Sequence, residues 1–465
     1  MTTEGVRIAV VGAGPAGFYA CEDLLKHEGF EVDLYDALPT PFGLVRAGVA
    51  PDHPKIKSVT RRYEKTAQDP RFRFFGGVEL GSDVEREELF ARYHAVVYAV
   101  GTRSDNRLGI AGEDRPGSHA ATEFVAWYNG HPDYADREFD LSARTAVVIG
   151  NGNVALDVAR MLVLEPDEIA ATDTADHAVE GLAKAQVEHV IVLGRRGPAQ
   201  AAFTNPELLE LGELRRCDVV VDPAELELDE HSAAWLEQDG RAIARKNVAI
   251  LREYSERPLA GKSHRMELRF LRSPLEVLGD GPDERVSGLR VVRNRIEPDG
   301  RGGLRAVPTG VQEVIECGLV LRSIGYRGRP LPGVPFDEGR GLIRNDGGRV
   351  TTEDGEPIPG EYAVGWIKRG PSGVIGTNKK DASDTIAKLL EDAQAGRLNE
   401  PSEPDRDAVE PWLRPRIPGL VTWDGWKSID EHEVAQGEPQ GRPRVKLVRV
   451  PEMIAVAEQQ PVGGA

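Results

Sequence analysis

The N-terminal segment alternates between apolar and mixed runs in the order strand, turn, helix, strand. Residues Val6–Val11 are almost entirely apolar, as in a strand that is buried on both faces. The glycine-rich turn Gly12–Gly17 follows, and Ala20–His27 continues with apolar residues at helical spacing. Apolar residues return over Glu31–Tyr35 and predict the next strand. This order is typical of the βαβ unit of a parallel sheet.

The same order of elements returns in the middle of the chain. An apolar strand over Thr145–Ile149 leads into a turn at Gly150–Asn153 and a helix over Ala155–Leu164. The next strand, Val190–Leu193, comes later because Pro166–Glu188 adds a helical, charge-rich insertion. The two units together predict an α/β protein with two Rossmann-like, dinucleotide-binding domains.

Two further apolar strands end in glycine and indicate where the chain crosses between domains. They are Ala95–Gly101 and Leu319–Gly325. We predict a discontinuous first domain over residues 1–104 and 320–465, with the second domain, residues 105–319, inserted into it. The length of 465 residues also favours two domains, since it exceeds one ordinary core.

Charge and hydropathy narrow the classes of partner. The net charge of −18 argues against nucleic acid as the main partner. No apolar run approaches the roughly 20 residues that cross a bilayer, so we expect no membrane association and, by default, a cytoplasmic location. Residues Glu400–Glu410 are acidic and include two prolines, which predicts a surface connection.

Cysteine usage excludes several kinds of site. Cys21, Cys217 and Cys317 lie far apart in the sequence. No pair has the close spacing of a redox-active disulfide, a metal site or an iron–sulfur centre. We therefore expect ordinary thiols and no bound metal.

The first glycine turn carries a dinucleotide fingerprint, because residues 12–17 read GAGPAG between a strand and a helix. Gly12 permits the tight turn, Gly14 lets the backbone approach a pyrophosphate, and Gly17 allows close packing of helix and strand. The helix N-terminus then presents its amides to the phosphates. Asp36 closes the next strand, near the roughly 20-residue spacing of the acid that binds a ribose.

The second turn repeats the pattern with a different residue at the end of its second strand. Gly150, Asn151, Gly152 and Asn153 form the turn, and Ala155 takes the place of the third glycine. The strand after it ends in two consecutive arginines, Arg195 and Arg196. Arginines there would pair with a 2′-phosphate through charge-assisted hydrogen bonds, whereas an acid would accept from a 2′-hydroxyl. This turn therefore predicts NADPH in preference to NADH.

Two such folds in one chain, the first ending in an acid and the second in arginines, predict FAD followed by NADPH. A hydride can then pass from the nicotinamide to the flavin, since the flavin N5 is its natural acceptor. This transfer needs no acid or base from the protein, which must hold the two rings together and exclude water.

Five segments of the sequence carry a family resemblance. They resemble the signature of the adrenodoxin reductase family of ferredoxin–NADP reductases, in particular its bacterial members of the mycobacterial type, and the similarity extends over nearly the whole chain. The segments are Pro39–Arg46, Gly48–Lys55, Gly150–Arg160, Gly194–Gly197 and Gly365–Lys380.

The resemblance implies contacts and roles for particular residues. His53 and Glu207 match a pair that lies near the nicotinamide and the flavin in this family, and they are the candidate catalytic residues. Asp36 stands where the family usually has Glu. The FAD contacts are expected at Ala13, Asp36, Leu44, Val78, Trp366, Gly373, Val374 and Ile375, and the NADP contacts at Gly150–Asn153, Arg195, Arg196 and Glu207.

The electron acceptor that the resemblance implies is a ferredoxin, a small acidic iron–sulfur protein, which in turn can serve a cytochrome P450. An acidic reductase then needs a local positive surface. The segment Arg241–Arg272 has nine Lys and Arg against three Asp and Glu, a local charge of +6. Its leading candidates for partner binding are Arg241, Arg245, Lys246, Arg265 and Arg269.

Other functions remain to be weighed against this interpretation. A pyridine-nucleotide disulfide reductase needs neighbouring thiols beside the flavin, and the sequence has none. A flavin- and NADPH-dependent monooxygenase, or another NADPH-dependent flavin reductase, stays open as the alternative. An NADPH-sensing protein or the electron-input subunit of a glutamate synthase is a third, but such a subunit carries clustered cysteines for iron–sulfur centres.

Overall fold

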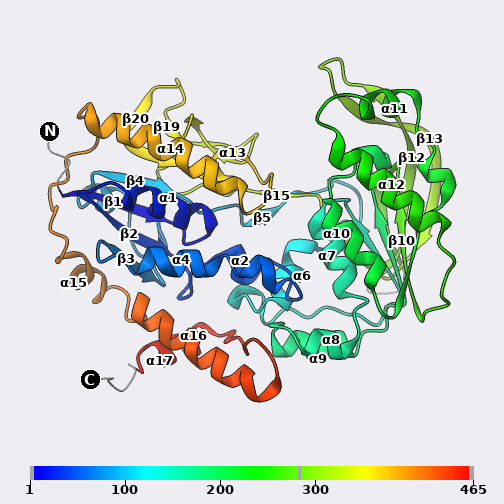
Figure 1. Cartoon of the computed structure of the whole chain (residues 1–465), viewed down its shortest axis with the longest axis horizontal. Coiled ribbons are helices and arrows are strands. Elements are labelled where there is room, and N and C mark those ends of the chain that lie inside the picture. The colour runs from blue at the N-terminus through cyan, green and yellow to red at the C-terminus, as the bar shows by residue number, and fades with distance from the viewer. Residues whose placement is uncertain (1–4, 281–283, 460–465) are drawn as a thin grey trace. The chain divides into compact units, whose positions relative to one another are not determined.

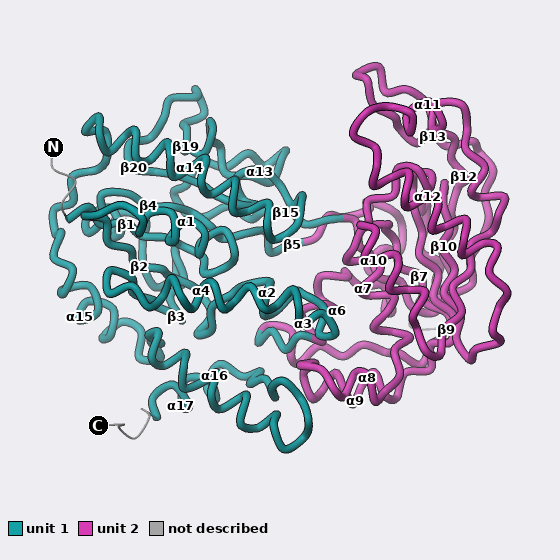
Figure 2. Tube along the Cα trace, in the orientation of Figure 1, with its two compact units in different colours: residues 1–104, 129–132, 325–465 teal, residues 105–128, 133–324 magenta. Residues whose placement is uncertain are grey.

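The computed structural model describes residues 5–280 and 284–459 (Figure 1). The chain divides into two compact units, coloured separately in Figure 2. Unit 1 comprises residues 1–104, 129–132 and 325–465, and unit 2 comprises residues 105–128 and 133–324. Each unit is built around its own largely parallel sheet, which confirms the predicted α/β class.

Unit 1 contains an eight-stranded sheet in the order β18-β19-β20-β4-β1-β2-β3-β21. Its five central strands are parallel, and the outer strands β18, β19 and β21 pair antiparallel to their neighbours. The strands are β1 (Val6–Val11), β2 (Phe30–Asp36), β3 (Phe72–Gly76), β4 (Ala95–Tyr98), β18 (Asn345–Asp346), β19 (Arg349–Thr351), β20 (Pro357–Ala363) and β21 (Val421–Thr422).

Helices cover one face of this sheet most completely. Apolar side chains of α1, α14 and α16 share one core cluster with β1 and β2, whereas α15 packs in the cluster on the opposite face. The helices of unit 1 are α1 (Pro15–Leu25), α2 (Leu44–Ala47), α3 (Pro54–Lys57), α4 (Thr60–Ala67), α5 (Arg86–Phe90), α13 (Trp366–Arg369), α14 (Thr377–Gln394), α15 (Val409–Leu413), α16 (Trp423–Gly437) and α17 (Val450–Ala457).

Unit 2 contains a six-stranded sheet in the order β6-β14-β7-β8-β10-β9. A three-stranded antiparallel sheet packs on one of its faces through an apolar cluster. The strands are β6 (Ser118–Ala120), β7 (Thr145–Ile149), β8 (His189–Leu193), β9 (Cys217–Val220), β10 (His264–Arg269) and β14 (Leu319–Arg322), with β11 (Arg272–Asp280), β12 (Arg285–Pro298) and β13 (Leu304–Glu316) in the smaller sheet.

The other face of the six-stranded sheet is covered by helices, whose side chains join its largest core cluster. They are α6 (Ala121–Tyr128), α7 (Asn153–Met161), α8 (Pro166–Ala170), α9 (Asp176–Ala183), α10 (Asn205–Glu210) and α12 (Ala242–Glu256). Helix α11 (Glu230–Leu236) belongs instead to a small separate cluster that it shares with α12. The short strands β5 (Ser104–Asp105) and β15 (Tyr326–Arg327) pair with each other, as do β16 (Phe336–Asp337) and β17 (Leu342–Ile343). No helix of the described residues is long and apolar enough to cross a membrane.

Both nucleotide turns are shorter than the sequence pattern suggested. Helix α1 begins at Pro15, directly after Gly14, whereas the pattern predicted a helix from Ala20. Proline is well suited to the first helical position, because its missing N–H would have no partner there. Helix α7 likewise begins at Asn153 instead of Ala155. The amides of both helix N-termini therefore start immediately at the second glycine of each turn.

The boundary between the units also differs from the sequence-based one. The predicted division between residues 319 and 320 cuts through β14, which the structure places wholly in unit 2. This strand lies between β6 and β7 in the second sheet and pairs with both. In addition, residues 129–132, which lie in the predicted second domain, are grouped with unit 1.

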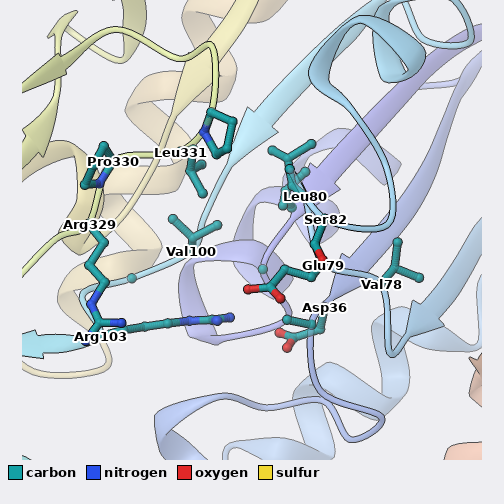
Figure 3. A pocket seen from close by; sticks show the side chains of 16 residues that line it. Asp36, Val78, Glu79, Leu80, Ser82, Val100, Arg103, Arg329, Pro330 and Leu331 are labelled. Atoms are coloured by element: carbon teal, nitrogen blue, oxygen red, sulfur yellow. The ribbon is translucent and has the colours of Figure 1, made fainter.

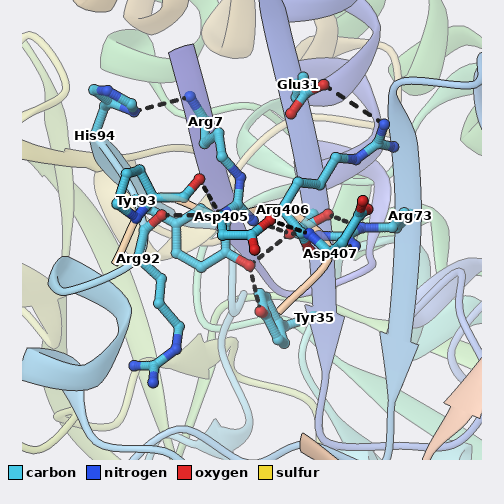
Figure 4. Close-up of polar contacts among 12 residues, drawn as sticks. Arg7, Glu31, Tyr35, Arg73, Arg92, Tyr93, His94, Asp405, Arg406 and Asp407 are labelled. Carbon is cyan, nitrogen blue, oxygen red and sulfur yellow. Dashed lines mark hydrogen bonds and ion pairs between the residues drawn. The ribbon is translucent and has the colours of Figure 1, made fainter. Parts of the chain in front are cut away.

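A buried charge network holds the sheet of unit 1 to the segment near residue 405 (Figure 4). The Asp33 carboxylate is 3% exposed and accepts hydrogen bonds from Arg7 at 3.0 Å, from Arg73 at 2.6 and 2.7 Å and from the Tyr93 hydroxyl at 2.6 Å. The same two arginines donate to backbone carbonyls of this segment, residues 404–406, which we call the link. Arg7 donates to Pro404 and Arg73 to Arg406. One carboxylate thus balances two guanidiniums.

We expect Asp33→Asn to destabilise unit 1 strongly, because it removes the charge that balances Arg7 and Arg73. Breaking a buried ion pair by removing one partner costs about 3–5 kcal/mol. Denaturant unfolding followed by circular dichroism measures the change. The matched control is Asp424→Asn, which breaks an exposed pair with Lys427 and should cost about 1 kcal/mol or less. Equal midpoints for the two variants would contradict the assigned role.

Candidate functional site

The turn after β1 can be formed only with glycine at its first position. Gly12 has a φ of +112°, and a Cβ there would lie 2.5 Å from the carbonyl oxygen of Ala99. A Cβ at Gly17 would lie 2.0 Å from the carbonyl oxygen of Gly12, so the helix packs directly on the turn. Nothing lies within 4 Å of a Cβ at Gly14. The turn therefore leaves open space where the fingerprint places a pyrophosphate.

Asp36 braces this turn from the end of β2. Its carboxylate is buried and accepts hydrogen bonds from the amides of Ala13 at 2.7 Å and Leu38 at 2.9 Å. A carboxylate offers about four lone-pair sites, so Asp36 keeps acceptors for ribose hydroxyls. Its position therefore fits the ribose-binding role that the sequence predicts.

A cavity of about 330 Å³ opens beside the turn at the carboxyl ends of β1, β2 and β3 (Figure 3). This is the edge where open α/β sheets bind their ligands. Two predicted FAD residues, Asp36 and Val78, lie in its wall together with Gly12. The whole lining belongs to unit 1 and comprises Val11, Gly12, Asp36, Ala37, Val78, Glu79, Leu80, Gly81, Ser82, Val100, Gly101, Arg103, Arg329, Pro330, Leu331 and Pro332.

The other predicted FAD residues converge on the same turn from two further loops. A Cβ at Gly43, the residue before Leu44, would lie 3.0 Å from the Cα of Gly14. A Cβ at Gly365, the residue before Trp366, would lie 2.5 Å from the Cβ of Ala16 on α1. These approaches bring the residues predicted to contact the flavin next to the helix that begins at the glycine turn.

Trp366 and the segment after it leave polar groups and space for a ring system. The indole Nε1 of Trp366 is buried and has no hydrogen-bond partner, and the ring of Tyr326 lies 5.3 Å from the indole ring. Val374 is 58% exposed, between Gly373 and Ile375, just before α14 begins at Thr377. The unpartnered N–H and the N-terminal dipole of α14 both favour an acceptor or an anionic ring there.

The turn of unit 2 has the same construction. Gly150 has a φ of +139°, and a Cβ there would lie 2.1 Å from the carbonyl oxygen of Ser323. Nothing lies within 4 Å of a Cβ at Gly152. The side-chain Nδ2 of Asn151 is buried without a hydrogen-bond partner, whereas Asn153 Oδ1 accepts from the Thr204 amide at 2.8 Å. An open turn and an unused donor fit a second nucleotide.

Arg195 and Arg196 form a positive site at the end of β8. Neither guanidinium forms a hydrogen bond or an ion pair with the residues that the structure describes. Burial lowers the pKa of Arg196 below its ordinary value, and the adjacent charge of Arg195 lowers it further. Two neighbouring cations without a carboxylate suit an anion, and a 2′-phosphate is the anion that the sequence predicts at this strand end.

The two candidate catalytic residues lie in different units. His53 belongs to unit 1, where it is 9% exposed and immediately precedes α3. Glu207 belongs to unit 2, where it is 8% exposed in the first turn of α10, with Oε2 3.9 Å from Nη1 of Arg160. Both side chains are thus largely shielded from solvent.

Part of the basic segment Arg241–Arg272 is used inside unit 2. Arg269 and Arg272 both pair with Glu313, and Arg245 donates to the backbone carbonyl of Leu236. The guanidinium of Arg241 lies 3.9 Å from the ring centre of Trp235. Two exposed cations of α12 form no hydrogen bond or ion pair among the described residues, and they are Lys246 and Arg252.

The three thiols are unsuited to disulfide chemistry. Cys21, Cys217 and Cys317 are buried and free. Burial raises the pKa of both Cys217 and Cys317 to about 12, and it raises that of Cys21 as well. Since the thiolate is the reactive form, these cysteines stay inert at neutral pH.

Three charged residues of the cavity were missed by the sequence analysis. Glu79 follows β3, while Arg103 and Arg329 follow strands that end near Gly101 and Gly325. For Glu79 and Arg103, position after a strand of the unit 1 sheet was the available signal, because carboxyl ends of parallel strands gather at one edge of the sheet. Arg329 follows β15, which lies outside that sheet, so this signal did not mark it. The sequence alone did not reveal that these loops meet around one cavity.

The two sheets and their glycine turns define a flavoprotein reductase with two dinucleotide-binding folds. A family model described as pyridine nucleotide-disulphide oxidoreductase matches residues 6–196. The chain is 50% identical to the NADPH-ferredoxin reductase FprA of Mycobacterium tuberculosis over 97% of this chain and 98% of that protein. It is 42% identical to the mitochondrial NADPH:adrenodoxin oxidoreductase of Salvelinus fontinalis, over 97% of this chain and 91% of that protein.

A solved structure of one of these relatives also matches the fold of this chain. Mycobacterium tuberculosis FprA in complex with NADPH matches with a TM-score of 0.91 at 49% identity, over 97% of this chain and 99% of that one. The chain belongs to the adrenodoxin reductase family of ferredoxin–NADP reductases. This confirms the family expected from the sequence.

We expect replacement of Arg195 and Arg196 by Ala to weaken use of NADPH and to leave use of NADH nearly unchanged. Each lost charge-assisted pair with the 2′-phosphate is worth roughly 1–3 kcal/mol. Steady-state kinetics with each nucleotide measures the change in kcat/KM. Arg293→Ala, an exposed arginine of the same unit, is the matched control. Equal losses of kcat/KM with both nucleotides would show that Arg195 and Arg196 do not bind the 2′-phosphate.

Proposed function

We propose that this protein is an NADPH–ferredoxin oxidoreductase that contains FAD. The observation that carries the proposal is the contrast between two similar turns: the strand after the first ends in Asp36, and the strand after the second ends in Arg195 and Arg196. The acid suits the ribose of FAD, and the arginines suit the 2′-phosphate of NADPH. The mycobacterial relatives named for this activity support the same assignment.

The residues of the chain bind, orient and shield the reacting groups. FAD, when bound, accepts two electrons with a hydride and releases them one at a time. The amides at the start of α1 would hold its pyrophosphate and Asp36 its ribose, and the unpartnered indole N–H of Trp366 would donate to an acceptor of the ring system. In unit 2, the start of α7 and the arginine pair orient NADPH.

His53 and Glu207 are proposed to act at the reacting rings. A buried imidazole and a buried carboxylate could set the rate of hydride transfer or of nicotinamide release. Leu44, Val78, Gly373, Val374 and Ile375 are proposed to shape the FAD site.

The final acceptor in this proposal is an acidic ferredoxin that serves further enzymes such as a cytochrome P450. Arg241, Arg245 and Lys246 of the basic segment are proposed to contact it. The protein would act in the cytoplasm.

The test of the core proposal is spectroscopic. Purified protein should show flavin absorption bands, and under anaerobic conditions NADPH should bleach them much faster than NADH, because only NADPH has the 2′-phosphate. Ferredoxin with cytochrome c as the reporter then measures one-electron turnover. Equal bleaching rates would contradict the nucleotide assignment. A long-lived oxygen adduct of the reduced enzyme would favour the alternative, a flavin-dependent monooxygenase.

A charge reversal tests the acceptor surface. Lys246→Glu combined with Arg252→Glu should lower ferredoxin-dependent turnover about tenfold at low salt, and the difference should shrink as salt screens the encounter. Both side chains are exposed and make no hydrogen bonds within the described chain, so the fold should persist. Reduction of ferricyanide should not change.

The control for this experiment is Lys184→Glu with Arg293→Glu, which makes the same charge change elsewhere on unit 2. If both double variants slow the reaction equally, only net charge matters. The basic segment would then not be the docking surface.

A further inference from the structure

Two arginines extend over the mouth of the unit 1 cavity. Arg103 comes from the segment after β4, and Arg329 from the segment after β15. Figure 3 shows the Arg103 side chain reaching across the opening toward Asp36 and Glu79, while Arg329 enters from the side of Pro330. Both residues are exposed, and neither guanidinium has a hydrogen bond or ion pair within residues 5–280 and 284–459.

The charges around the cavity come from four different segments. Asp36 and Glu79 follow β2 and β3, and the arginines come from the two other loops. Asp36 accepts from two backbone amides and keeps acceptors for hydroxyl groups. Such a cavity suits a ligand that carries both hydroxyl donors and a di-anion. An adenosine diphosphate group combines ribose hydroxyls with a pyrophosphate in this way.

The loops that carry the arginines are held in place. Strands β5 and β15 pair with each other directly beside them, and the Ser104 hydroxyl donates to the Arg327 carbonyl at 2.8 Å. On the other side, a Cβ at Gly81 would lie 2.4 Å from the Pro332 ring, so the segment after Arg329 packs against the loop after β3. The backbone of the clamp is therefore fixed, and only the two long side chains need to adjust.

We propose that Arg103 and Arg329 form a clamp that closes over the adenosine diphosphate half of FAD and retards its release. The inference rests on the proposed function in taking FAD as the cofactor. Arg103 immediately precedes β5, and Arg329 lies just after β15. The chain leaves unit 1 after residue 104 and returns at residue 325, so the clamp would connect bound FAD to these two strands. FAD occupancy then orders these two strands.

The experiment measures release of FAD from the holoenzyme by the rise in flavin fluorescence. Arg103→Ala and Arg329→Ala should each speed release about tenfold. Release from the unmodified enzyme should also accelerate with potassium chloride, because salt screens guanidinium–pyrophosphate pairs, and the double variant should lose most of this salt dependence. Arg103→Lys should restore part of the effect through its charge alone.

Arg340→Ala is the matched control, since Arg340 is an exposed arginine of unit 1 outside the cavity and should leave release unchanged. Hydrogen exchange gives a second readout: at saturating FAD, the amides of β5 and β15 should exchange faster in the double variant than in the unmodified enzyme.

Two results would overturn the clamp: release rates equal to that of the control, or release from the unmodified enzyme that is independent of salt. Protein purified without any flavin would instead contradict the proposed function, so the two failures are distinguishable.

Discussion

In both units the first glycine of the nucleotide turn is pressed against the backbone at the end of another strand. Gly12 faces the carbonyl of Ala99, and Gly150 faces the carbonyl of Ser323, each so closely that a Cβ would collide. This contact fixes where each helix begins, and so where its first amides point. It also fixes the neighbouring segment, since the residues after Ala99 and after Ser323 lead to the crossings between the units. The positions of the cavity wall and of strands β5 and β15 thus depend on this steric constraint.

The chemistry of the two sites differs through residues that lie outside the turns. At the end of β2, Asp36 is satisfied by backbone amides and retains acceptors for hydroxyl groups. At the end of β8, Arg195 and Arg196 have no counter-ion in the described chain, so the strand end can accept an anion. The proposed assignment of two nucleotides thus rests on the sign of the charge at one strand end in each unit. The buried, protonated thiols leave an external acceptor as the destination of the electrons.

Much of this arrangement was accessible from the sequence, because it depends on local pattern. Strands Val6–Val11 and Thr145–Ile149 were predicted with their observed bounds, since apolar runs next to glycine turns leave few alternatives. The helix starts were placed too late, because proline after Gly14 and asparagine after Gly152 are both residues typical of turns. The sequence could not show that Arg103 and Arg329 line the same cavity, because this depends on the pairing of β5 with β15. The use of Arg245 within unit 2 was equally hidden, as its acceptor is a backbone carbonyl.

The network around Asp33 has a consequence for how the C-terminal part of the chain can vary. Arg7 and Arg73 grip the link through the carbonyls of Pro404 and Arg406. Every amino acid offers such a carbonyl, so these two contacts do not depend on which side chains the link carries. They constrain its length, because an inserted or deleted residue would move both carbonyls out of register with the guanidiniums. Among relatives, this stretch should hold its residue count.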